Sequence, residues 1–151
     1  MRGLLFICLL VLALAPLASQ AQDSRAVIRD FVEFSGKQLL TCKATISQSC
    51  NSRECSHTAL NPGVQSLTID LVKPEVTSCW FDECYTNRFI EAFDHAGLVI
   101  GFREPEMFFN NITLFDVWVK LRPFEDHVVT MSFGTHAKST HTTHYDCEVE
   151  P

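Results

Sequence analysis

The spacing of the cysteines constrains this 151-residue chain more than any other feature. Beyond Cys8, the sequence contains Cys42, Cys50, Cys55, Cys79, Cys84 and Cys147. An even number of cysteines in a small exported domain is typical of a disulfide framework. The intervals Cys50–Cys55 and Cys79–Cys84 each enclose four residues, a length that suits a hairpin closed by a disulfide. Pairing within these hairpins leaves Cys42 to pair with Cys147, which would join the first predicted strand to the last.

Zinc is the alternative interpretation of the same cysteines. Thiolates separated by four residues lie within the ligand spacing of zinc sites. A zinc site with four thiolates would leave two cysteines unexplained, and an exported chain meets conditions that oxidise thiols. The sequence also lacks the Cys-x-x-Cys motif of thiol-disulfide oxidoreductases. We therefore expect structural disulfides and no cofactor.

Export is predicted from residues 1–21, which have the pattern of a secretory signal peptide. Arg2 precedes an apolar run, and Ser19 and Ala21 supply the small residues before the cleavage site. A membrane anchor is disfavoured because Pro16 interrupts the run and a spanning helix needs about 20 apolar residues. The mature chain, residues 22–151, would carry 11 basic and 18 acidic residues, a net charge of −7. We expect a secreted or periplasmic protein without membrane insertion after cleavage, and no nucleic-acid partner, since phosphate binding needs a basic surface.

Alternating apolar residues predict strands along most of the mature chain. The clearest run is Phe115, Val117, Val119 and Leu121, and similar runs lie near Leu40, Leu67, Leu98, Val129 and Tyr145. Residues 24–35 instead show helical spacing, although a strand there stays an alternative. We expect a mainly β fold: a single domain over residues 22–151 with its core at about 38–149. Seven or eight antiparallel strands would form a meander closed into a small barrel or a sandwich, with one short N-terminal helix.

Histidines are the candidate metal ligands. His136, His141 and His144 could hold zinc or copper if their rings converged. Their intervals of five and three residues match no standard ligand motif, so polar surface is the competing interpretation and no metal is favoured. The carboxylates fall mostly in predicted turns, and the motifs of serine and metal hydrolases are missing from the sequence. These observations favour a binding protein over an enzyme.

Aromatic residues are the candidate partner contacts. Trp80 and Phe81 lie inside the Cys79–Cys84 interval, and Trp118 falls on the polar face of its strand. Exposed aromatic side chains often anchor partners, although they can equally cover the open end of a barrel. The acidic charge favours a basic protein, and a glycan is the other partner class. Asn111-Ile112-Thr113 is a glycosylation sequon that matters only in a eukaryotic source.

The layout resembles that of uncharacterised small exported bacterial β-rich proteins. The matching features are Thr41-Cys42, the two hairpin cysteine pairs, Thr68-Ile69-Asp70-Leu71 and Cys147, and together they cover most of residues 38–149. In architecture the chain is also similar to periplasmic β-barrel inhibitors of lysozyme. The expected function is a non-enzymatic, inhibitor-like module that binds a protein or glycan in the cell envelope or outside the cell. The alternative is a metal-binding protein or small hydrolase that uses the C-terminal histidines.

Overall fold

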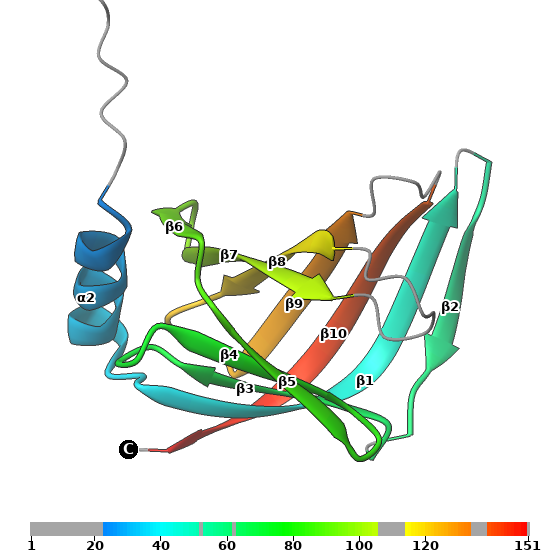
Figure 1. Cartoon of the computed structure of the whole chain (residues 1–151), viewed down its shortest axis with the longest axis horizontal. Coiled ribbons are helices and arrows are strands. Elements are labelled where there is room, and N and C mark those ends of the chain that lie inside the picture. The colour runs from blue at the N-terminus through cyan, green and yellow to red at the C-terminus, as the bar shows by residue number, and fades with distance from the viewer. Residues whose placement is uncertain (1–22, 52, 62, 106–113, 134–138, 151) are drawn as a thin grey trace, which may run out of the picture.

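The computed structural model describes residues 23–51, 53–61, 63–105, 114–133 and 139–150. Over these residues it is mainly β, with one helix and ten strands in one antiparallel sheet (Figure 1). The elements are α2 (Ser24–Ser35), β1 (Leu39–Asn51), β2 (Cys55–Ala59), β3 (Gln65–Asp70), β4 (Glu75–Trp80), β5 (Glu83–Arg88), β6 (Glu91–Asp94), β7 (Leu98–Pro105), β8 (Leu114–Leu121), β9 (His127–Phe133) and β10 (Ser139–Glu150). The predicted β-rich class is confirmed, and residues 24–35 form a helix.

The sheet is not closed into a barrel, and it is one sheet instead of a two-sheet sandwich. Its strand order is β5-β4-β3-β1-β10-β9-β8-β7-β6, and β2 pairs with the far half of β1. The two end strands, β5 and β6, follow each other in the chain and are separated only by Phe89 and Ile90. At that point the chain stops pairing with β4 and begins to pair with β7, and the N–H of Ile90 donates to the carbonyl oxygen of Gly101 (2.7 Å).

The strand count is also corrected, from seven or eight to ten. One added strand is β2, whose five exposed residues lack the apolar alternation of the other strands and which pairs with the far half of β1. Another comes from residues 85–93, a single run in the sequence that is divided into β5 and β6 on either side of Phe89–Ile90. A bend of this kind changes the pairing partner without changing the polarity pattern, so alternation does not reveal it.

The core lies on the inner face of this curved sheet and is covered at one end by the helix. The largest fully buried side chains come from strands spread across the sheet. They include Tyr145, Phe102, Leu40, Leu67, Ile69 and Leu98. Helix α2 packs against β6 and β7 and buries Val27, Ile28 and Phe31. The helix begins at the Asp23 cap, whose carboxylate accepts the N–H of Arg25, and ends at Gly36, whose φ of 72° suits a residue without a side chain.

Three disulfides join cysteines that face each other across paired strands. They are Cys42–Cys147, Cys50–Cys55 and Cys79–Cys84, the pairs that the spacing predicts. Cys42 and Cys147 are partners in the β1–β10 ladder, and both are buried. The two short pairs close the β1–β2 and β4–β5 hairpins. Three disulfides indicate an oxidising compartment.

Asp70 fixes the turn between β3 and β4. Its Oδ1 accepts the N–H groups of Val72 (3.0 Å) and Lys73 (2.8 Å), and its Oδ2 lies 3.0 Å from Nζ of Lys73. Burial by itself raises the pKa of the Asp70 carboxyl group. The N–H donors and the ammonium group of Lys73 outweigh burial, so the pKa of Asp70 is lowered from its ordinary value.

This lowered pKa predicts an acid-dependent part of the stability. A carboxyl group with a depressed pKa in the folded state stabilises the fold above its unfolded-state pKa, and this contribution is lost as the pH falls through the folded-state value. We expect Asp70→Asn to be less stable than the wild type at pH 7, with the difference shrinking below about pH 4. Urea unfolding at pH 7, 4 and 2.5 gives the free energy of unfolding of both proteins. A difference between the two free energies that stays constant with pH would contradict the prediction.

Candidate functional site

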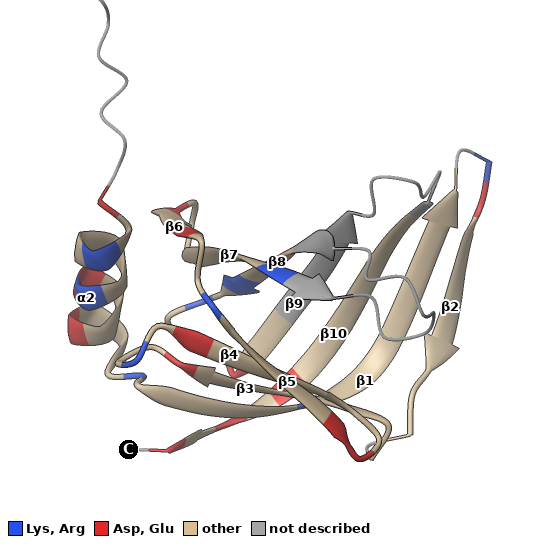
Figure 2. Cartoon of the chain, viewed as in Figure 1, with Lys and Arg blue, Asp and Glu red and all other residues tan. Residues whose placement is uncertain are grey.

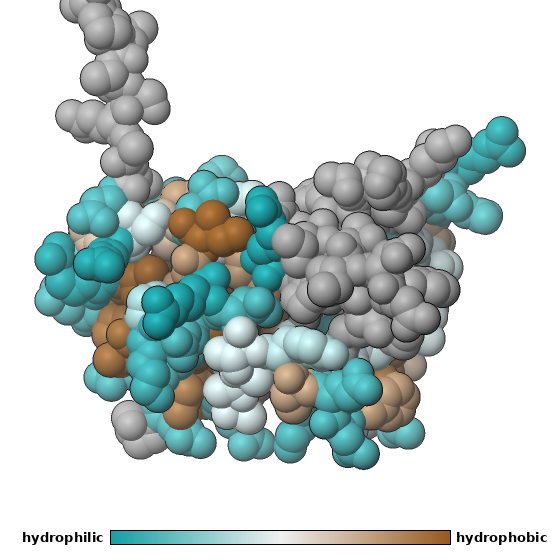
Figure 3. Space-filling view, in the orientation of Figure 1, coloured by the Kyte–Doolittle hydropathy of each residue, from teal (hydrophilic) through white to brown (hydrophobic). Residues whose placement is uncertain are grey.

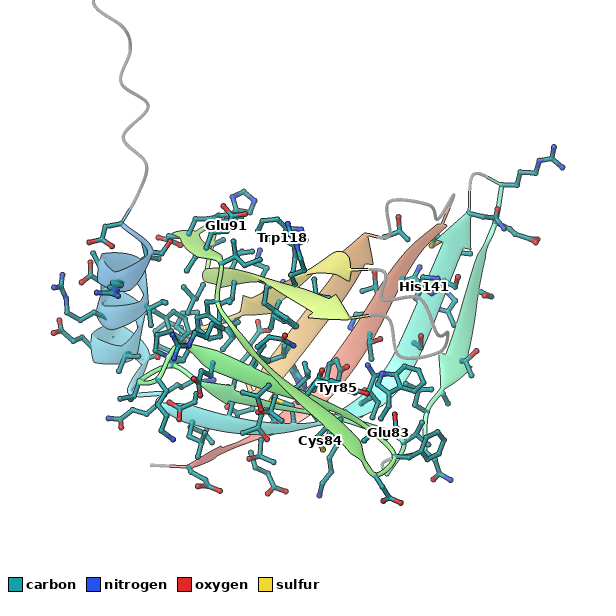
Figure 4. The ribbon with its side chains drawn as sticks, viewed as in Figure 1. Glu83, Cys84, Tyr85, Glu91, Trp118 and His141 are labelled. Carbon is teal, nitrogen blue, oxygen red and sulfur yellow. A yellow bond between two sulfur atoms is a disulfide. The ribbon has the colours of Figure 1, made fainter. Side chains whose placement is uncertain are left out.

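A disulfide joins β4 and β5 close to the turn between them. Only Phe81 and Asp82 connect the two strands, since Trp80 and Glu83 form the last pair of the ladder. The next pair is the disulfide Cys79–Cys84. Figure 4 shows Glu83, Cys84 and Tyr85 following one another along β5 from this turn. We call Trp80, Phe81, Asp82 and Glu83 the hairpin tip.

Phe81 is presented to solvent in a constrained backbone. Its side chain is 69% exposed, and its φ is 51°, a left-handed conformation that a bulky residue rarely adopts. Its N–H donates to the carbonyl oxygen of Val64 (2.8 Å), which fixes the turn against the segment that leads into β3. Conformations of this kind persist where the surroundings enforce them, and they are frequent at binding sites. The hairpin tip therefore holds the backbone of an apolar residue in one place, and little backbone ordering remains to be done when a partner binds.

Two carboxylates follow Phe81 in the chain. Asp82 and Glu83 are exposed, and neither forms an ion pair with another residue in the part of the chain that the structure describes. Figure 2 shows acidic residues at this end of the hairpin. Trp80, on the other side of Phe81, is half-buried. The hairpin tip thus combines one exposed aromatic ring with two uncompensated negative charges, an arrangement suited to an apolar pocket with a basic rim.

Trp118 lies in a different part of the sheet. It is half-buried on the outer face of β8, next to Gly101 of β7, and contacts Phe93 edge to face with ring centroids 5.8 Å apart. A Cβ atom at Gly101 would come within 2.8 Å of the Trp118 ring, so glycine is what allows the indole to lie against β7. Figure 4 places Trp118 away from Glu83. The structure brings Trp80 and Phe81 together and separates Trp118 from them.

The C-terminal histidines do not converge where the structure describes them. His141 and His144 are exposed on β10, and their spacing of three residues puts them on opposite faces of that strand. His136 and the Asn111 sequon lie outside the described residues. Within residues 23–51, 53–61, 63–105, 114–133 and 139–150, no three His, Cys, Asp or Glu side chains are grouped to hold a metal ion. Over the same residues, no helix has the length and apolar character needed to cross a membrane.

A pocket at the helix end of the molecule has no counterpart in the sequence analysis. It has a volume of about 530 Å³ and lies between α2 and the turn from β6 to β7, with Pro123 at its edge. Phe31 and Phe34 belong to the helical pattern that the sequence shows, so the helix wall of the pocket could have been predicted from their shared face. Asp94 and Leu98 line the opposite wall. Their approach to the helix depends on long-range packing that local patterns do not contain.

Comparison with known proteins returns no match to this chain among family models, curated proteins or solved structures.

Proposed function

We propose that the mature chain is an exported, non-enzymatic binding module that recognises a basic protein through the hairpin tip. The observation that carries this proposal is Phe81, which is exposed on a disulfide-clamped turn between half-buried Trp80 and two acidic residues. Aromatic side chains held in place before binding are typical anchors of protein interfaces. The predicted signal peptide and the three disulfides agree with a secreted or periplasmic location.

Charge selects the class of partner. Asp82 and Glu83 require lysine or arginine side chains around the pocket that receives Phe81, because unpaired carboxylates lose hydration when an interface forms. The net charge of −7 on residues 22–151 attracts a basic protein over about a Debye length. A neutral or acidic glycan offers no positive charge to these carboxylates, so a basic protein is the better occupant. A cationic hydrolase of the lysozyme type has the required charge, and an anchored side chain entering its cleft would act in an inhibitor-like way.

Phe81→Ala should weaken partner binding by about 30-fold or more, as expected for a central aromatic anchor. Alanine keeps a Cβ atom at the strained position, so the backbone preference of the turn is largely unchanged. The partner would be retained from envelope extract on the wild-type protein at low salt and purified. Its affinity for both proteins would then be measured by calorimetry, together with circular dichroism spectra that confirm the fold.

Phe124→Ala is the matched control, since Phe124 is also an exposed phenylalanine (81%, against 69% for Phe81) on the turn between β8 and β9. We expect this variant to bind like the wild type. Asp82→Asn/Glu83→Gln should bind more weakly at low salt and respond less to added salt, because the screened attraction is gone. Equal loss from Phe81→Ala and Phe124→Ala, or binding unaffected by Phe81→Ala, would contradict the proposal.

A further inference from the structure

We propose that the pocket between α2 and the β6–β7 turn binds an amphiphilic organic cation, a molecule with an apolar body and an ammonium head. This site is separate from the hairpin tip. Helix α2 lies at one end of the long axis of the molecule, and the β4–β5 turn points toward the other end (Figure 1). The inference therefore stands independently of the proposed protein partner.

The shape and the floor of the pocket suit a small apolar body. Its volume of about 530 Å³ falls within the range of 300 to 1,000 Å³ that small-molecule sites occupy. Val27 and Phe31 of α2 and Leu98 of β7 line it, and each of these side chains is already buried. The floor thus belongs to the core and keeps its shape when the pocket is filled. Preformed pockets of this kind bind ligands at low ordering cost.

Aromatic rings extend the apolar surface of the pocket into solvent. Phe34 lines the pocket and is 67% exposed, and Phe124 is 81% exposed. The two rings meet edge to face, with centroids 5.4 Å apart and an interplanar angle of 72°. Figure 3 shows apolar surface at this end of the molecule. Exposed aromatic faces attract ammonium groups through the ring quadrupole, and the attraction grows as water is displaced.

Two carboxylates select a positively charged head. Asp30 lines the pocket from α2 and Asp94 from the end of β6, so the negative charges come from opposite walls. Asp94 accepts the N–H of Gly97 (3.3 Å), and Asp30 pairs with Arg29, which does not line the pocket. Among the described residues, no lysine or arginine lines it. Fatty acids and other anionic amphiphiles are therefore disfavoured, and a cationic head is favoured.

The test compares three probes that share a decyl chain and differ in their heads: decyltrimethylammonium, decyl sulfate and decyl maltoside, all below their micelle concentrations. Binding to the full mature protein is measured by calorimetry. We expect the cationic probe to bind most tightly. We expect Asp30→Asn/Asp94→Asn to weaken that probe by about tenfold and leave decyl maltoside unchanged. Asparagine at position 94 keeps an oxygen that can accept the N–H of Gly97, so the turn is preserved.

Two further variants separate this site from the hairpin tip. Phe34→Ala should weaken both the cationic and the neutral probe, because it removes apolar wall without removing charge. Asp82→Asn/Glu83→Gln removes the same number of charges at the hairpin tip and should leave binding of the cationic probe unchanged. Equal affinity for all three heads, or equal weakening by the charge variants at both sites, would overturn the proposal. A failure of this kind would not affect the Phe81 experiment, because that experiment measures a different ligand at the hairpin tip and uses Phe124 only as a control.

Discussion

Replacing Cys42 and Cys147 together by alanine should lower the free energy of unfolding by about 4 to 5 kcal/mol. The disulfide joins residues 105 positions apart, so its loss releases nearly the whole domain from a constraint in the unfolded state. In the chain-entropy model, the stabilisation grows with the logarithm of the enclosed loop. Both residues are buried between β1 and β10, so lost packing adds to this cost.

The matched control is Cys50→Ala/Cys55→Ala, which removes a disulfide of sequence separation 5. The same model predicts a loss of only about 2 kcal/mol for such a short loop. Urea unfolding of the oxidised proteins, followed by tryptophan fluorescence, compares the two variants. If both variants lose the same free energy of unfolding, the Cys42–Cys147 disulfide does not stabilise the fold through the long loop that it closes.

Lys37→Met should lower the free energy of unfolding by about 2 to 4 kcal/mol. The Lys37 side chain is only 8% exposed. Its Nζ donates to the carbonyl oxygen of Glu125 (2.6 Å) and to Oδ1 of Asp126 (3.1 Å), and lies 3.5 Å from the carbonyl oxygen of Arg122. Methionine fills similar space without a donor, so these acceptors lose their partner. Lys37, which follows the helix, thereby holds the turn between β8 and β9.

Lys73→Met provides the comparison for this variant. The Lys73 side chain is 73% exposed and pairs with Asp70 at the surface, where an ion pair contributes less than about 1 kcal/mol. Chemical denaturation of the two variants at pH 7 gives both values. Equal losses would mean that the buried ammonium group does not organise the 122–126 turn.

The β-rich class and the helix were predictable because both depend on local periodicity. Leu40, Cys42 and Ala44 alternate on β1, and the same inner face is buried in the structure. Residues 24–35 carry cap residues at both ends as well as helical spacing. Strand β2 was not predictable from alternation, because all five of its residues are exposed. The division at Phe89–Ile90 was not predictable either, because the exchange of one neighbouring strand for another depends on the curvature of the whole sheet.

The candidate site was predictable only in part. The four-residue interval between Cys79 and Cys84 placed Trp80 and Phe81 in a closed hairpin, but it did not reveal the positive φ that turns Phe81 to solvent. The polar-face position of Trp118 suggested exposure. Its packing against Phe93 beside Gly101 depends on the register of β6, β7 and β8, which lies outside any local pattern.

Photo-crosslinking from the hairpin tip tests directly whether Phe81 contacts a basic protein. Phe81 would be replaced by p-benzoylphenylalanine in the mature protein, and Phe124 would carry the same group in a parallel sample. After irradiation in envelope extract, mass spectrometry identifies the cross-linked peptides. We expect position 81 to cross-link to one basic protein at low salt, with the yield falling as salt rises, and position 124 not to reach that protein. Equal cross-linking from both positions, or cross-links from position 81 only to acidic proteins or to none, would contradict the assignment of the hairpin tip as the binding site for a basic protein.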